Sequence, residues 1–218
     1  IRDRCQDTGL AVVFLEIGQD VALSGKYVED AVNDGVRQAY ENFRKSSVHP
    51  LSRKNSGDNT PAIIHTRIVK GDKVKVSCMM KGFGSENMSR LFMLTPADGV
   101  EGVVEKVVET VKDAGSCPCP PVILGVGVGG TMEKAAIMSK HALLNDLDKE
   151  NPDEYLSSLE KKMLEKINAL GIGAEGFRGD VTALRVFIET ENTHIAGLPV
   201  AVTVQCHCSR HGERIIEG

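Results

Sequence analysis

Short apolar runs of strand type alternate along this chain with longer segments of helical spacing. Residues 9–18 and 122–128 are rich in valine and isoleucine, which is typical of buried strands. Apolar residues recur every three or four positions over 98–114 and over 152–170, so both segments predict helices. The simplest fold that buries both patterns is a single compact α+β domain over residues 1–218, with mixed or antiparallel sheets flanked by helices.

Two neighbouring strand patterns, 62–69 and 73–80, are separated by Lys70-Gly71-Asp72 and predict a β-hairpin. The segment 81–87, K-G-F-G-S-E-N, predicts a glycine-rich loop. The other expected elements are a helix over 26–43, a helix over 131–147, and strands over 181–189 and 199–205.

Composition narrows the class of protein. No apolar stretch reaches the ~18 residues that a membrane-spanning helix requires, and Ile1-Arg2-Asp3-Arg4 lacks the apolar run of a signal peptide. The net charge is −4, tryptophan is absent and aromatic residues make up 4%, so we expect no nucleic-acid partner. The chain begins without methionine, almost at its first motif, which predicts truncation at the N-terminus. A reducing, cytoplasmic location without membrane contact is expected.

The six cysteines stand at positions 5, 78, 117, 119, 206 and 208. In a reducing compartment, clustered cysteines bind metals or do chemistry more often than they form disulfides. Cys78 lies within a strand pattern and is expected in the core. The pairs Cys117-Pro118-Cys119 and Cys206-His207-Cys208 permit a four-thiolate zinc site, so a non-enzymatic zinc or structural module is one alternative.

Three widely spaced cysteines also suit an iron–sulfur cluster. A cubane cluster held by three thiolates leaves one iron without a protein ligand, and that iron can polarise a substrate hydroxyl and carboxylate. Dehydration of a 2-hydroxy acid needs this help because hydroxide is a poor leaving group, and it also needs a base and an acid. Spacing alone leaves five cysteines outside the core as candidate ligands.

Five motifs occur in an order that points to one family. They are Cys5-Gln6-Asp7-Thr8-Gly9, Asp58-Asn59-Thr60-Pro61-Ala62, Lys81-Gly82-Phe83-Gly84-Ser85-Glu86-Asn87, Cys119-Pro120-Pro121 followed by G-V-G-V-G-G-T over 125–131, and His194-Ile195-Ala196-Gly197-Leu198-Pro199 leading to Cys206. In these motifs the chain resembles the alpha subunit, or N-terminal catalytic domain, of class I fumarase and L-tartrate dehydratase, from Cys5 to about Arg210.

The resemblance implies a [4Fe–4S] cluster whose protein ligands are Cys5, Cys119 and Cys206. Cys117 and Cys208 are extra thiols beside these expected ligands. A second departure is the segment 177–180, F-R-G-D, which stands where the family usually carries consecutive glycines.

The resemblance also implies contacts with a substrate. Asp7 and His194 are expected to be catalytic, with Asp7 as proton donor or acceptor for the leaving hydroxyl. Gln6, Arg44 and Gly84 are expected to bind substrate, Arg44 through a carboxylate. Without the resemblance, Asp7 would be interpreted as an Asx-turn or helix cap, Arg44 as a complement to a helix dipole, and His194 as a surface loop residue.

The implied activity is the reversible hydration or dehydration of a small dicarboxylic acid. Fumarate to malate is the main expectation, and dehydration of L-tartrate is the alternative. Nothing in this chain matches the other half of the family's active site, which carries further basic residues and a proposed base. We therefore expect a beta subunit or C-terminal domain as partner, in an oligomeric enzyme.

The string G-V-G-V-G-G over 125–130 also matches the dinucleotide-binding pattern G-x-G-x-x-G, and Asp146 follows at a suitable distance. The strand does not open an evident βαβ unit, however, so a tight strand-to-helix turn is the simpler interpretation. A further hypothesis is that the amides of this turn hold an anion or pack beside the cluster.

Overall fold

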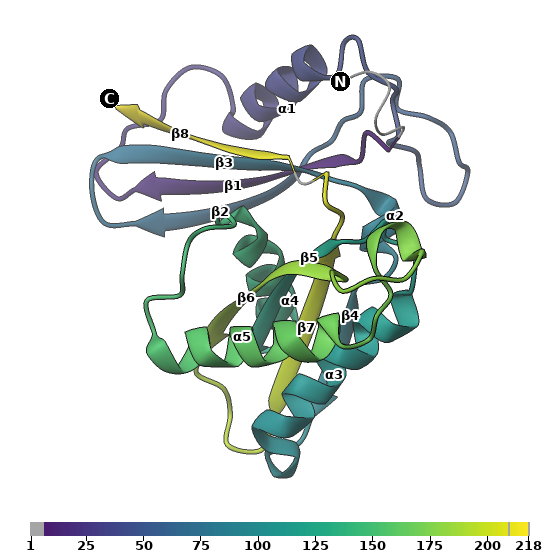
Figure 1. Cartoon of the computed structure of the whole chain (residues 1–218). Helices are drawn as coiled ribbons and strands as arrows, with labels where there is room; N and C mark the ends of the chain where they lie inside the picture. The colour runs from purple at the N-terminus through teal and green to yellow at the C-terminus, as the bar shows by residue number, and fades with distance from the viewer. Residues whose placement is uncertain (1–6, 209, 218) are drawn as a thin grey trace. The chain divides into compact units, whose positions relative to one another are not determined.

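The computed structural model describes residues 7–208 and 210–217. The chain divides into two compact units, which are described separately (Figure 1). Unit 1 comprises residues 1–83 and 210–218, and unit 2 comprises residues 84–209. Mixed sheets and helices occur along the described chain, so the predicted α+β class is confirmed. No helix among the described residues is long and apolar enough to cross a membrane.

Unit 1 contains a four-stranded sheet in the order β2-β1-β3-β8. The strands are β1 (Leu10–Gly18), β2 (Ile63–Val69), β3 (Lys73–Lys81) and β8 (His211–Glu217). One helix, α1 (Val28–Ala39), packs on this sheet. Odd-numbered residues of β1 form the core with Val36 and Tyr40, because alternate side chains of a strand share one face.

The predicted hairpin over 62–80 is wrong, although both of its strands exist. Strand β1 lies between β2 and β3, parallel to the first and antiparallel to the second. The link at Lys70–Asp72 crosses the end of β1, where the carbonyl of Gly71 accepts a hydrogen bond from the amide of Asp20 at 3.0 Å. A β-carbon on Gly18 would overlap that same carbonyl. Turn residues are a local signal, so they could not reveal that β1, which comes earlier in the chain, pairs with both strands and separates them.

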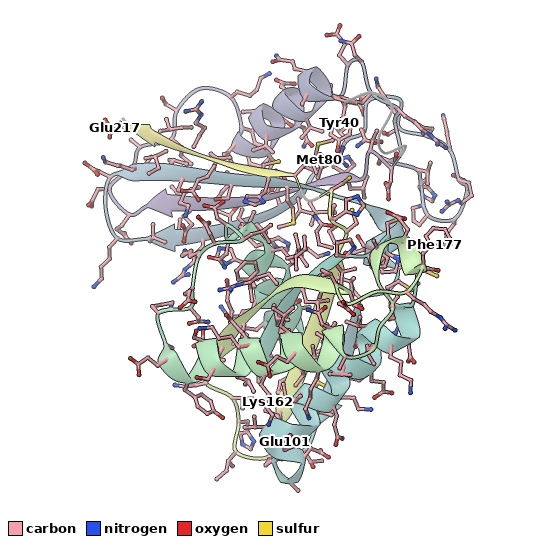
Figure 2. The ribbon with its side chains drawn as sticks, in the orientation of Figure 1. Tyr40, Met80, Glu101, Lys162, Phe177 and Glu217 are labelled. Carbon is pink, nitrogen blue, oxygen red and sulfur yellow. The ribbon has the colours of Figure 1, made fainter. Side chains whose placement is uncertain are left out.

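Unit 2 contains a second four-stranded sheet, in the order β4-β7-β5-β6. The strands are β4 (Arg90–Leu94), β5 (Val122–Gly129), β6 (Ala183–Glu191) and β7 (Leu198–Gln205). Helices α3 (Gly99–Ala114) and α5 (Glu154–Asn168) pack their apolar sides on one face of the sheet. An ion pair between Glu101 and Lys162 links these two helices at the surface (Figure 2).

Helix α4 (Met132–His141) covers the opposite face of the unit 2 sheet, and two glycines of β5 make this possible. A β-carbon on Gly125 would overlap the carbonyl oxygen of Ser139, and one on Gly127 would overlap that of Ala135. The glycines of the G-V-G-V-G-G string are therefore explained by close approach of a helix backbone to a strand. Strands β5 and β6 are parallel neighbours joined through α4 and α5, so the expectation that no βαβ-type crossover occurs here was wrong.

Other differences from the predicted elements are local. The 81–87 segment is not a plain loop, because β3 continues to Lys81 and a helical turn, α2 (Phe83–Glu86), follows. The helix expected over 131–147 ends at His141 and continues as a 3₁₀ turn, Ala142–Leu144. Further 3₁₀ turns occupy Pro96–Asp98 and Ala174–Gly176. The sequence did not reveal β4 or β8; β8 is exposed along its whole length and lacks a buried face.

Candidate active site

In unit 1, the carboxylate of Asp7 is held by two backbone amides. Oδ1 accepts a hydrogen bond from the amide of Gly9 at 3.0 Å, which forms the Asx-turn that the sequence permits. Oδ2 accepts one from the amide of Phe83 at 2.6 Å, in the K-G-F-G-S segment. A β-carbon on Gly82 would lie 2.9 Å from Oδ2, so a glycine is needed for this close approach. Cys5 and Gln6, the neighbouring predicted site residues, lie outside the described residues.

The loop that carries Arg44 is joined to the Asp7 turn. The hydroxyl of Thr8 donates a hydrogen bond to the carbonyl oxygen of Arg44 at 2.7 Å. The side chain of Arg44 is exposed, and α1 has already ended at Ala39. The structure thus brings the backbone of Arg44 to Thr8, the residue next to Asp7, from 36 residues away in the sequence.

Two further side chains hold the Asp7 turn in unit 1. Tyr40, which is 2% exposed beneath α1 (Figure 2), donates its hydroxyl to the carbonyl of Thr8 at 2.8 Å. Burial is the main cause that raises the pKa of Tyr40 to about 12. Arg210 donates from Nη2 to the carbonyl of Asp7 at 3.0 Å. Tyr40 belongs to the expected helix over 26–43 and Arg210 marks the end of the resemblance, and neither pattern indicated a contact with the Asp7 turn.

In unit 2, the two C-x-C segments are neighbours. Strands β5 and β7 are antiparallel, with Ile123 opposite Gln205, so the residues before β5 meet those after β7. Nδ1 of His207 lies 3.0 Å from the carbonyl oxygen of Cys119. Cys119 is exposed and has a φ of 54°, which is uncommon for a residue with a side chain. Cys206 is half-buried at the end of β7.

Glycines surround the Cys117–Cys119 loop in unit 2. A β-carbon on Gly84 would lie 3.5 Å from the carbonyl oxygen of Cys117, which places this predicted substrate residue beside the loop. A β-carbon on Gly176 would lie 2.5 Å from the β-carbon of Ser116. The segment 177–180, which differs from the family pattern, therefore comes directly after a residue that packs beside the cysteine loop.

His194 lies at the other end of the unit 2 sheet. It precedes β7, whereas Cys206 follows it, and eight strand residues span roughly 23 Å. Its Nδ1 accepts a hydrogen bond from the amide of Ala196 at 3.2 Å, and its side chain lines an apolar cavity of about 410 Å³. Within this chain, the structure does not bring His194 to the cysteines.

The glycine-rich turn at the end of β5 is hydrogen-bonded to the residue before His194. The hydroxyl of Thr193 donates to the carbonyl oxygen of Gly130 at 2.8 Å. Cys119 precedes β5, and Gly129 ends it. The glycine-rich turn and Cys119 therefore lie at opposite ends of β5.

Comparison with known proteins agrees with the motifs. Residues 2–215 match the family described as Fumarate hydratase (Fumerase). The chain belongs to this family. It is 44% identical over 222 residues to a putative L(+)-tartrate dehydratase subunit alpha of Methanocaldococcus jannaschii, covering 98% of this chain and 78% of the relative. It is 31% identical over 222 residues to the L(+)-tartrate dehydratase subunit alpha of Escherichia coli K12, covering 99% of this chain and 73% of the relative.

Membership of the fumarate hydratase family makes the chain a hydro-lyase of a family whose members are generally iron–sulfur enzymes. The thiols of this chain fit such a group in part. Cys119 and Cys206 are accessible, lie in adjacent segments and offer the soft sulfur donors that iron–sulfur clusters require. The third expected ligand, Cys5, lies outside the described residues.

The four cysteines of the two C-x-C pairs belong to the part of the chain that the structure describes. No three His, Cys, Asp or Glu side chains gather as metal ligands within that part. Cys78 packs against the unit 1 core, as predicted, and burial raises the pKa of its thiol.

Proposed function

We propose that this chain is the alpha-type subunit of an iron–sulfur hydro-lyase that dehydrates a small 2-hydroxy dicarboxylic acid, with L(+)-tartrate as the preferred substrate. The observation that carries the proposal is the adjacency of the Cys119 and Cys206 segments, with Gly84 beside them, in a chain that matches the family from residue 2 to residue 215. The resemblance implies that such thiols hold the catalytic cluster.

The choice of L(+)-tartrate revises the expectation from sequence. Fumarate was the main expectation, and the family description alone is compatible with it. The two relatives reported above, at 44% and 31% identity, are both named as L(+)-tartrate dehydratase subunits. Tartrate therefore becomes the first candidate, and fumarate and malate become the comparison substrates.

The three thiolates of Cys5, Cys119 and Cys206 would hold a [4Fe–4S] cluster. When bound, that group supplies a Lewis-acidic iron without a protein ligand. The guanidinium of Arg44 binds a substrate carboxylate, and the amide of Gln6 orients the substrate. Gly84 leaves room for the substrate because it has no side chain.

Asp7 acts as proton donor or acceptor for the leaving hydroxyl. Both of its carboxylate oxygens are fixed by backbone amides, which pre-organises the group before substrate binds. His194 is also assigned a catalytic role, but the strand that separates it from Cys206 means that it does not reach the cysteines of its own chain.

The site needs a second protein part. The resemblance assigns the proposed base that removes the carbon-bound proton to the other half of the active site. The relatives are named as alpha subunits, which supports a beta subunit or an equivalent C-terminal domain as the partner. We also propose a cytoplasmic location, because the cysteine ligands of a cluster must be reduced thiols.

The test is an anaerobic assay of the full protein, reconstituted with iron and sulfide and combined with its partner. L-tartrate, D-tartrate, malate and fumarate are supplied separately. The expected result is dehydration of L-tartrate to oxaloacetate with the highest kcat/KM, and little activity without the partner. A higher kcat/KM with fumarate or malate would overturn the substrate, and full activity without any partner would overturn the subunit assignment.

A further inference from the structure

Two buried polar side chains of unit 1, Thr8 and Asn59, join the turn that carries Asp7 to the loop that carries Arg44. Thr8 is 6% exposed and Asn59 is fully buried. Burial of a polar group is costly unless its hydrogen bonds are made, so the partners of these two side chains are informative.

The hydroxyl of Thr8 has two partners in the Arg44 loop. It donates to the carbonyl oxygen of Arg44 at 2.7 Å and lies 2.8 Å from the hydroxyl of Ser46. Thr8 directly follows Asp7 in the chain. One side chain thus ties the backbone of Arg44 to the residue next to Asp7.

Asn59 makes the same connection from the side of the D-N-T-P motif. Its Oδ1 accepts hydrogen bonds from the amides of Ser46 at 2.6 Å and Ser47 at 2.9 Å. Its Nδ2 donates to the carbonyl oxygen of Gly9 at 3.1 Å. Both lone pairs of the side-chain oxygen and one amide hydrogen are in use, which needs a carboxamide rather than a carboxylate.

The conformation of Asn59 is also specific. Its φ is 65°, in the left-handed region that asparagine tolerates better than most residues with a side chain. The motif therefore provides a backbone shape and a set of hydrogen bonds that serve one purpose, the attachment of the 44–47 loop to the 7–9 turn.

We infer that Thr8 and Asn59 are positioning residues for the dehydration reaction: they hold the Arg44 loop against the Asp7 turn, so that Arg44 is in place to bind a substrate carboxylate. This inference rests on the proposed function. Neither residue touches the substrate. Their effect passes through Arg44, and it is therefore an effect on substrate binding more than on the chemical step.

The first test compares Thr8→Val with Thr8→Ser in the reconstituted holoenzyme. Valine keeps the shape of threonine and removes the hydroxyl, whereas serine keeps the hydroxyl. Loss of a buried hydrogen bond predicts a rise in KM for L-tartrate of about tenfold in Thr8→Val, with kcat within about twofold of the parent. Thr8→Ser is expected to restore most of the KM. An unchanged KM in Thr8→Val overturns the inference.

A double-mutant cycle with Arg44→Met shows whether Thr8 acts through Arg44. The expected result is that Thr8→Val has little further effect on KM once Arg44 is replaced, since the two changes then remove one and the same contact. Equal effects of Thr8→Val in both backgrounds would show a general structural role and would overturn the inference.

Asn59→Asp gives a second, independent variant. It keeps an acceptor for Ser46 and Ser47 but places a carboxylate oxygen against the carbonyl of Gly9, so the same rise in KM is expected. The matched control is Asn55→Asp, an exposed asparagine of the same region that donates to the carbonyl of Lys45. Equal effects at Asn55 and Asn59, or loss of the cluster in both Thr8→Val and Asn59→Asp, would overturn the positioning role.

Cluster absorption and KM are measured on every variant, which separates two kinds of failure. A parent enzyme that binds the cluster but dehydrates none of the four acids overturns the proposed function and, with it, the inference. An active parent whose Thr8→Val variant behaves like the parent overturns the inference alone.

Discussion

The two units hold their candidate site residues by different physical means. Unit 1 fixes Asp7 and Arg44 through buried side-chain hydrogen bonds between segments that are far apart in the sequence. Unit 2 places Cys119 and Cys206 through strand pairing, since both follow from the antiparallel register of β5 and β7. From this contrast we expect substitutions in unit 1 to change the affinity for substrate. Substitutions in unit 2 are expected to change cluster binding or the stability of the sheet.

The largest effect is expected at the cysteines of unit 2. Cys119→Ser and Cys206→Ser should remove visible cluster absorption and reduce hydro-lyase activity to background, because a serine oxygen is a poor ligand for this type of cluster. The matched controls are Cys117→Ser and Cys208→Ser, each two residues away in the same segment. Both variants should keep the cluster absorption and the activity. Absorption and activity are measured together after anaerobic reconstitution. Retained absorption in Cys119→Ser alongside its loss in Cys117→Ser would reverse the assignment of ligands.

A second large effect concerns the packing of α4 on β5 in unit 2. Gly127→Ala should destabilise the fold by about 3 kcal/mol, since the new methyl group overlaps the carbonyl oxygen of Ala135. Gly35→Ala in α1 is the control, because no atom lies near its added methyl, and it should stabilise by ~0.5–1 kcal/mol. Denaturant unfolding measures both. Equal stability of the two variants would contradict the account of the glycine string.

The polar framework of unit 1 predicts a dependence on alkaline pH. The pKa of Tyr40 is raised to about 12 in the folded protein, while a tyrosine in the unfolded chain titrates near 10. Between these values the unfolded state loses its proton first, so the free energy of unfolding should fall by ~2 kcal/mol as pH rises from about 10 to 12. Tyr40→Phe should markedly reduce this slope, and the exposed Tyr155→Phe should retain it. A slope of unchanged size in Tyr40→Phe would show that other groups cause it.

The smallest expected effect compares two histidines of unit 2. His207 contacts the carbonyl of Cys119, whereas His194 lies beyond the far end of β7. His207→Ala should shorten the lifetime of the cluster in air by about threefold, as expected when support of a ligand segment is lost. His194→Ala should leave that lifetime unchanged while lowering activity. Faster loss of the cluster in His194→Ala than in His207→Ala would contradict the placement of these residues.

The sequence predicted unit 2 better than unit 1, for physical reasons. The α3 pattern of valines and the strand patterns of β5 and β7 are local, and each produced the expected element. Which strands pair is not a local property. The hairpin prediction was therefore wrong, because β1 pairs with both β2 and β3. The exposed strand β8 has no apolar alternation to detect.

Similar limits apply to the candidate site. The motifs named Asp7, Arg44, Gly84, Cys119 and Cys206, and the structure groups them within their own units. The motif spacing could not show that His194 and Cys206 stand at opposite ends of one strand, although the strand itself was predicted. Nor could it reveal the role of Asn59, because a buried carboxamide is recognised by its hydrogen-bond partners, which lie in other segments.

Metal and sulfide analysis decides whether Cys5, Cys119 and Cys206 of this chain hold an iron–sulfur cluster, as proposed above. The protein is purified without oxygen and analysed for iron, acid-labile sulfide and zinc per chain. The account predicts about four iron and four sulfide in the parent, both lost in Cys119→Ser and retained in Cys117→Ser. Stoichiometric zinc without sulfide in a colourless, oxygen-indifferent parent would contradict it.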